Sequence, residues 1–164
     1  MNFEEQNEPA SPERIEAFEK TRGVRLPEDY KAFLLETNGG KPAAENSYAK
    51  VAGWNWLVLQ ILYGLTDRPS DSIDAERFNN FSDFIHARML PFGYASACSL
   101  YMDLRDGVAH GKIYVMSRPP NATLLVDDTG FQDEDDYEDG LLLHPVANTF
   151  SEFLAMLGPD PNEA

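Results

Sequence analysis

The sequence is poor in the residues and segments that would place it outside the cell or in a membrane. Its single cysteine, Cys98, excludes an intramolecular disulfide and a zinc site built from cysteines. No apolar run approaches the roughly 20 residues of a membrane-spanning helix. Residues 1–9 are acidic and lack the basic and apolar regions of a secretory signal peptide. These absences predict a cytoplasmic protein.

The sequence also lacks the motifs of common enzyme classes, namely a phosphate-binding loop, a nucleophile elbow and the helix of zinc proteases. A cysteine nucleophile needs a base nearby, but no spacing ties Cys98 to His86, His110 or His144. The three histidines also lie in separate predicted elements, which disfavours a metal site. We therefore expect no enzymatic activity, no metal and no cofactor, with Cys98 as a small buried hydrophobic residue.

Basic side chains are scarce and unevenly placed. The chain has 13 Lys and Arg against 28 Asp and Glu, which gives a formal net charge of −15. No Lys or Arg follows Arg118, so residues 119–164 carry 11 acidic side chains and no basic one. This balance disfavours direct binding of nucleic acid, whose phosphates need a cationic surface. Charge placed so unevenly would attract a basic protein partner, although solubility alone is the favoured explanation for an acidic protein in general.

Most of this charge lies in one stretch, which is the candidate binding site. The EF-hand pattern fails here, because a loop that starts at Asp133 has Tyr137 at its fifth position and His144 at its twelfth. Three interpretations stay open: a surface for a basic partner, a solvated loop without a role, and a calcium site of another type. Tyr137 favours the first, since aromatic residues often anchor interfaces. The candidate partner-binding residues are Asp127, Asp128, Asp133, Glu134, Asp135, Asp136, Tyr137, Glu138 and Asp139.

Length and patterning predict one α+β domain. The 164 residues match a single domain in size, and 43% of them are hydrophobic. Helical spacing and capping residues predict a helix pair near the N-terminus with Leu34 on its inward face, a third helix after residue 72 and a last helix after residue 148. Helices at the start and end with strands between them indicate α+β rather than alternating α/β. The strand-like runs are 54–62, where a buried helix is the alternative, and 91–95, 99–104, 112–117, 123–126 and 141–143.

The domain boundaries follow from where the patterning begins and ends. We expect residues 1–10 to be a flexible lead, residues 11–158 to form the domain, and residues 159–164 to be a tail. Trp54 and Trp56 share one face if their segment is extended. We assign both to the core, because aromatic residues at this spacing usually pack inside.

Several segments, in order along the chain, resemble those of a known family. They are Ile15-x-x-Phe18-Glu19, Gly23-Val24-x-Leu26-Pro27-Glu28-Asp29-Tyr30-Lys31-x-Phe33-Leu34, Asn38-Gly39-Gly40, Leu62-Tyr63-Gly64-Leu65, Leu90-Pro91-Phe92-Gly93, Leu100-Tyr101-Met102-Asp103-Leu104, Gly111-Lys112-Ile113-Tyr114-Val115 and Val146-Ala147-Asn148-Thr149-Phe150-Ser151-Glu152-Phe153-Leu154. Together they cover most of residues 11–157. Their order resembles the SUKH superfamily, which is named partly for a fungal cell-wall-assembly regulator.

The resemblance implies an α+β fold in which helices, including the N-terminal pair, pack against a mixed, mostly antiparallel sheet. Because bacterial members of this superfamily are mostly immunity proteins of toxin systems, it also implies a protein that binds and blocks a toxin domain, for example a nuclease. We expect that toxin to present a basic surface. We expect this chain to bind neither a membrane nor nucleic acid directly. The alternative is an intracellular interaction scaffold of the cell-wall-assembly-regulator type.

Overall fold

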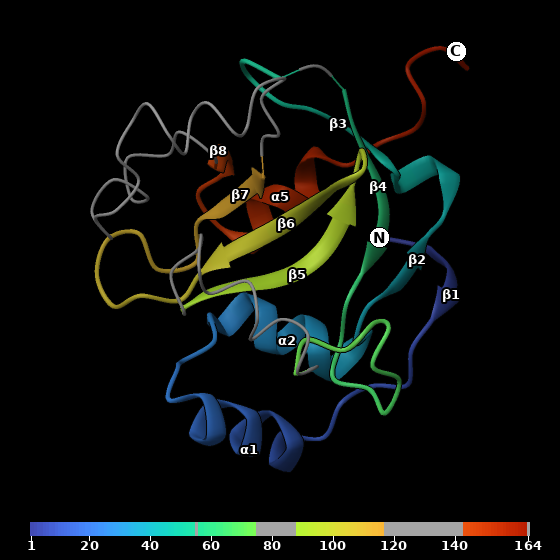
Figure 1. Ribbon diagram of the computed structural model, residues 1–164. Coiled ribbons are helices and arrows are strands. Elements are labelled where there is room, and N and C mark those ends of the chain that lie inside the picture. The colour runs from blue at the N-terminus through green and yellow to red at the C-terminus, as the bar shows by residue number, and fades with distance from the viewer. Residues whose placement is uncertain (55, 75–87, 117–142, 164) are drawn as a thin grey trace.

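The computed structural model describes residues 1–163 except 55, 75–87 and 117–142. The strands form a sheet in the order β1-β2-β4-β5-β6-β7-β8, with β3 paired to β4, and each pair of neighbouring strands is antiparallel. With the helices of the described part packed beside this sheet, the predicted single α+β domain is confirmed (Figure 1). The strands are β1 (Phe3–Gln6), β2 (Gly40–Pro42), β3 (Tyr48–Lys50), β4 (Trp56–Leu62), β5 (Met89–Ala95), β6 (Cys98–Asp103), β7 (Ile113–Met116) and β8 (Leu143–Ala147).

Helices α1 (Pro12–Arg22) and α2 (Glu28–Glu36) form the predicted N-terminal pair. The Ser11 hydroxyl caps α1 by accepting a hydrogen bond from the Arg14 amide at 3.2 Å. Gly23 ends α1 with a φ of 63°, a left-handed conformation that glycine adopts without steric cost. In Figure 1, α2 lies between α1 and the sheet, so α1 forms the outer layer on this side.

Helix α5 (Phe150–Met156) closes the fold and shares a core with α2. The Thr149 hydroxyl caps it by accepting a hydrogen bond from the Glu152 amide at 3.0 Å, and the helix begins after residue 148, as the sequence predicts. The Phe150 ring lies edge-on to the Tyr30 ring, with 4.9 Å between the ring centroids. The aromatic core at this junction consists of Tyr30, Phe33, Phe92, Phe150 and Phe153.

Most of the predicted elements are confirmed in the described part. Leu34 is fully buried and therefore lies on the inward face of α2, whereas the next residue, Leu35, is 42% exposed. The third helix expected after residue 72 and the strand expected at 123–126 fall largely or wholly on residues outside the described part. The strand-like runs at 54–62, 91–95, 99–104 and 112–117 coincide with β4, β5, β6 and β7, and the run at 141–143 reaches the first residue of β8.

Strand β1 lies where the sequence predicts a flexible lead. It pairs with β2, with Phe3 opposite Pro42 and Gln6 opposite Gly40. The Phe3 ring lies 6.2 Å from the ring of Phe33 in α2. The other three residues of β1 are exposed, so this edge strand has no alternation of apolar and polar residues by which it could be identified.

The assignment of both tryptophans to the core is wrong for Trp56. Trp54 is half-buried and packs against the core, but Trp56 is 38% exposed. The cause is the alternation of side chains along a strand. Leu57 and Leu59 occupy the buried face of β4, which turns Trp56 to the opposite face.

Candidate functional site

Asn38, just after α2, joins segments that are far apart in the sequence. Its side-chain oxygen accepts a hydrogen bond from the Leu65 amide at 2.8 Å. Its side-chain nitrogen donates to the Leu65 carbonyl at 2.9 Å and to the Glu8 carbonyl at 2.8 Å. Asn38 takes a φ of 56°, a left-handed conformation in which asparagine is enriched. One buried side chain therefore satisfies three backbone groups.

Glycines allow the backbone to approach closely around Asn38. A Cβ atom on Gly64 would lie 2.0 Å from the Asn38 carbonyl oxygen, and one on Gly39 would lie 2.4 Å from the Leu62 carbonyl oxygen. No side chain fits at these distances. Residues 38–40 and 62–65, which we call the Asn38 corner, are thus two sequence motifs that the fold brings into contact.

Arg68 connects the N-terminal segment to the loop after β4. Its Nη2 atom donates a hydrogen bond to Asn7 Oδ1 at 2.5 Å and forms an ion pair with Asp71 Oδ2 at 2.6 Å. Asn7 in turn donates through Nδ2 to the Asn38 carbonyl at 2.8 Å. The Arg68 side chain is 66% exposed, so solvent weakens the ion pair. The chain of hydrogen bonds nevertheless ties the loop to the Asn38 corner.

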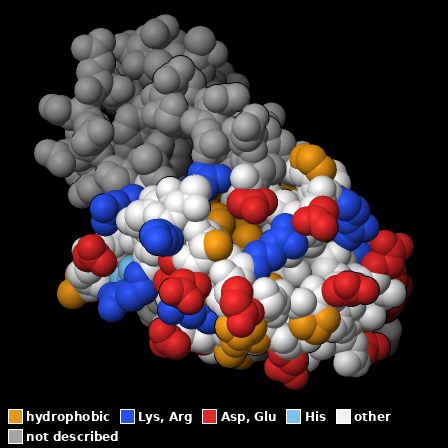
Figure 2. All heavy atoms as spheres, turned by 90° about the horizontal axis from the view of Figure 1, so that it is seen from below, with side chains coloured by type: hydrophobic (Ala, Val, Ile, Leu, Met, Phe, Trp, Pro, Cys, Tyr) orange, Lys and Arg blue, Asp and Glu red, His pale blue; other side chains and the backbone are white. Residues whose placement is uncertain are grey.

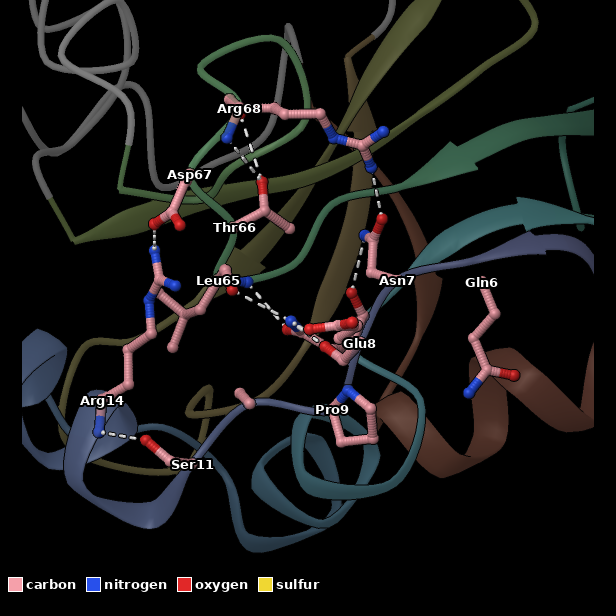
Figure 3. A pocket seen from close by; sticks show the side chains of 12 residues that line it. Gln6, Asn7, Glu8, Pro9, Ser11, Arg14, Leu65, Thr66, Asp67 and Arg68 are labelled. Atoms are coloured by element: carbon pink, nitrogen blue, oxygen red, sulfur yellow. Dashed lines mark hydrogen bonds and ion pairs between the residues drawn. The ribbon is translucent and has the colours of Figure 1, made fainter.

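A hollow of about 500 Å³ lies beside this corner (Figure 3). It is lined by residues 6–11 and 65–68 together with Arg14 and Asn38. Figure 3 shows the Arg14 and Asp67 side chains facing one another, and their ion pair measures 3.0 Å. None of the described residues that line the hollow is a histidine or a cysteine, and their polar side chains largely bond to one another or to backbone. We interpret it as part of the framework that braces the corner.

The predicted partner-binding residues, Asp127, Asp128 and 133–139, all lie outside the described part of the chain. The structure does describe where their segment is attached. Met116, the last residue of β7, and Leu143, the first residue of β8, are paired in register. Residues 117–142, which we call the β7–β8 connection, therefore leave and rejoin the sheet at one point on two neighbouring strands.

A second hydrophobic cluster holds this attachment point. It consists of Met89, Tyr101 and Leu143, which are buried, and Tyr114 and Met116, which pack against them. Burial raises the pKa of Tyr101 to about 12, as expected for a phenol in apolar surroundings. Met116 and Leu143, which flank the β7–β8 connection, are thus held by packing.

Charge is distributed differently over the described surface. Figure 2 views the molecule from below, from the side of α1, and shows Lys and Arg side chains interspersed with Asp and Glu. Ion pairs account for part of this mixing, for example Lys31 with Glu19 at 3.2 Å. The β7–β8 connection, by contrast, holds eight acidic residues and one basic residue, Arg118. The charge of one sign is therefore most concentrated in the connection.

The described residues that could carry nucleophilic or metal chemistry are separated. His110 and His144 each place Nε2 2.7 Å from a backbone carbonyl oxygen, while Cys98 is half-buried and packs against the core. His86 lies outside the described residues. Within the ranges that the structure describes, no group of three His, Cys, Asp or Glu side chains could hold a metal ion.

Sequence reasoning missed a groove beside β3 and β4. It has a volume of about 470 Å³, and the residues that line it include Tyr48, Trp56, Met156, Asp160 and Glu163. We call it the Trp56 groove. The alternation Trp-Leu-Val-Leu-Gln along β4 was the available signal, because it places the two leucines on one face and the tryptophan on the other.

Comparisons with known proteins fit this architecture. The model of the SMI1 / KNR4 family (SUKH-1) matches residues 9–156, a span from just before α1 to the last residue of α5. No curated protein matches the chain. In the part of the chain that is described, no helix has both the length and the apolar character needed to cross a membrane.

Proposed function

The chain belongs to the SMI1 / KNR4 family (SUKH-1), and we propose that it is a cytoplasmic immunity protein that binds a toxin domain and neutralises it by occlusion. The family match supports a role in protein–protein interaction. The proposed mechanism requires no bond to be made or broken by this chain, because a bound protein that covers an active site suffices. The family alone is equally compatible with a regulatory scaffold. The preference for an immunity protein therefore rests on the charge distribution.

The observation that carries the proposal is the charge of the β7–β8 connection. Eight carboxylates in 26 residues, against the one cation of Arg118, create a local negative potential. What supports a binding role is that this charge is attached at the paired residues Met116 and Leu143. A binding segment with both ends held in a sheet loses less conformational entropy on association than a free tail.

The proposed partner surface is a basic cleft. Nucleases carry such clefts because their substrates are polyanions. Carboxylates of Asp127, Asp128, residues 133–136 and residues 138–139 would occupy the positions of substrate phosphates, with Tyr137 as an aromatic anchor. Such an arrangement excludes the substrate by direct competition and gives fast, salt-sensitive association.

The test of this function is co-expression of the chain with the toxin domain encoded beside its gene. We expect restored growth of the producing cells and a stable complex in which toxin activity is blocked. Undiminished toxicity without complex formation would contradict the proposal. Recovery of several unrelated regulatory proteins, with no effect on a toxin, would instead favour the scaffold of the cell-wall-assembly-regulator type.

A calcium site in the same acidic residues is separable from partner binding. A ligand present at 100 times its dissociation constant stabilises the folded state by about 2.7 kcal/mol. We expect the melting temperature to stay the same when calcium chloride is titrated against a control of equal ionic strength. A saturable rise with calcium that magnesium does not reproduce would replace the partner-binding proposal with a metal site.

A further inference from the structure

We propose that the Trp56 groove is a docking site for a cationic segment of a protein partner, anchored by an arginine side chain. The groove lies between the β3–β4 pair and residues 158–163 of the C-terminal segment. The described residues that line it, within 48–56 and 156–163, do not belong to the β7–β8 connection. The proposal therefore goes beyond the immunity function and can be tested without knowledge of any toxin.

The aromatic wall of the groove follows from strand register. Tyr48 pairs with Val58 and Lys50 pairs with Trp56, so these four side chains share one face of the β3–β4 pair. The opposite face carries Leu57, which is fully buried. Trp56 thus lies on the outward face of β4, because Leu57 and Leu59 occupy the face that packs against the core. Exposed tryptophan is rare on surfaces without a partner and is enriched where partners bind.

The second wall is the C-terminal segment, which is held in place by backbone contacts. Gly158 and Tyr48 exchange two backbone hydrogen bonds, of 2.7 and 2.9 Å. Further along, the Asp160 carboxylate accepts hydrogen bonds from the Asn162 amide at 2.8 Å and from its side-chain nitrogen at 3.1 Å. The wall is therefore ordered before any partner arrives, which lowers the entropic cost of binding.

The charge of the groove selects a cation as the occupant. Asp160 and Glu163 add two carboxylates, and Lys50 adds one ammonium group, so the balance at the groove is negative. A hydrogen bond to Asp160, desolvation, and the negative charges of Asp160 and Glu163 all raise the pKa of Tyr48, in keeping with carboxylates close to its hydroxyl group. An anionic segment would be repelled from this wall.

Arginine fits the two walls better than other cationic side chains. Its planar guanidinium group can stack on the face of a tryptophan ring, which attracts cations more strongly than the other aromatic rings do. The same group can donate two hydrogen bonds to one carboxylate, which the ammonium group of lysine cannot do in that geometry. Because Trp56, Tyr48 and Glu163 all line the groove, aromatic rings and a carboxylate are available there for both kinds of contact.

The experiment uses the isotope-labelled full chain and the probe peptide acetyl-Gly-Ser-Arg-Ser-Gly-amide, followed by NMR. The control peptide carries citrulline in place of arginine, which keeps the shape and removes the charge. We expect saturable shifts of the Trp56 indole N–H and of the backbone amides of 158, 160 and 163, with the citrulline peptide binding about threefold to fivefold more weakly.

Matched variants separate the groove from general charge. Glu163→Gln should weaken the arginine peptide about threefold, and Trp56→Ala should abolish the shifts at 158–163 while the rest of the spectrum stays folded. Glu36→Gln removes one exposed charge elsewhere and should leave binding unchanged. Equal shifts from both peptides, an equal effect of Glu36→Gln, or shifts confined to other surfaces would overturn the proposal. None of these outcomes depends on whether a toxin is neutralised.

Discussion

The two ends of β4 are built for different purposes. At its last residues, the strand enters the Asn38 corner, where a Cβ atom on Gly64 would lie 2.0 Å from a backbone oxygen and Asn38 satisfies both backbone groups of Leu65. At its first residue, Trp56 is 38% exposed beside an open groove. The strand therefore begins at a groove with room for a partner side chain and ends at the Asn38 corner, where no atom can be added at Gly64.

The difference explains which residues carry the family resemblance. The motifs at 38–40 and 62–65 belong to that resemblance, and both lie in the Asn38 corner. Neither Tyr48 nor Trp56 belongs to a motif. The motifs of the Asn38 corner thus reflect backbone geometry and core packing, whereas the residues of the proposed docking site lie outside the motifs.

The largest expected loss of stability comes from a substitution in the Asn38 corner, the closely packed end of β4. Gly64→Ala should lower the free energy of unfolding by about 4 kcal/mol or more, because the new methyl group meets the Asn38 carbonyl rather than a movable side chain. The matched control is Gly158→Ala, which has open space around its Cβ position and should change stability by less than about 0.5 kcal/mol. Urea unfolding followed by circular dichroism gives both values. Equal stabilities would mean that the close approach is not maintained in solution.

The next largest loss of stability is expected on the buried face of α2, the helix that precedes Asn38. Leu34→Ala should cost about 3 kcal/mol, within the range of 2–5 kcal/mol for buried leucine, because it leaves a cavity against the sheet. Leu35→Ala removes the same atoms from a side chain that is 42% exposed and should cost less than about 1 kcal/mol. Thermal melting of the pair measures the difference. Similar losses for both variants would contradict the assignment of the inward face.

A smaller loss is expected when only the hydrogen bonds of the corner are removed. Asn38→Gly keeps the freedom to adopt a positive φ but leaves the Leu65 amide and carbonyl without their partner. We expect a cost of about 2 kcal/mol, set by the burial of unsatisfied backbone groups. Asn38→Ala should cost more, since it adds backbone strain. If the two variants melt together, the φ of this residue contributes nothing to stability.

The smallest effect at neutral pH is expected for Tyr30→Phe. No described residue forms a hydrogen bond to the buried Tyr30 hydroxyl, so its removal should change stability by less than about 1 kcal/mol. Burial raises the pKa of this phenol above its ordinary value of 10.0, so the folded state holds the proton where the unfolded state releases it.

The sign of the pH effect follows from that difference. The contribution of Tyr30 to stability is complete below pH 10 and declines as the pH rises further. Above pH 10, this group lowers the free energy of unfolding by about 1.4 kcal/mol for each further pH unit. Urea midpoints measured between pH 8 and 11 should therefore fall less steeply for Tyr30→Phe than for the unaltered chain. Identical slopes would show that the phenol is accessible to solvent.

Much of the fold could be predicted from the sequence, because local signals decide it. Ser11 and Gly23 mark the two ends of α1, and the spacing of Tyr30, Phe33 and Leu34 marks the inward face of α2. These signals act within one or two helical turns. The order of the family motifs then indicated how such elements combine.

Features set by long-range contacts could not be predicted in this way. The hairpin between β5 and β6 turns at Ser96 and Ala97, with φ values of 50° and 61° and without glycine. The Ser96 hydroxyl accepts a hydrogen bond from the Val58 amide at 2.8 Å, a contact across 38 residues that supports this turn. No local pattern in the sequence predicts the contact between the motifs at 38–40 and 62–65 either. The role of the acidic residues remains a prediction.

The most direct test of the central claim is the association rate of the cognate toxin domain with a charge-neutralised β7–β8 connection. The variant combines Asp133→Asn, Glu134→Gln, Asp135→Asn and Asp136→Asn. Its charge-matched control combines Glu5→Gln, Glu13→Gln, Glu16→Gln and Glu36→Gln, all at exposed positions of the described surface.

The measurement is stopped-flow association at low salt and at physiological salt, where screening acts over about 8 Å. The account predicts unchanged folding of both variants, association about tenfold slower for the connection variant at low salt, and a flatter salt dependence that the control does not show. The same association rate for the connection variant and the unaltered chain at low salt would contradict the account, because the acidic residues would then be solvated surface and the toxin would bind elsewhere.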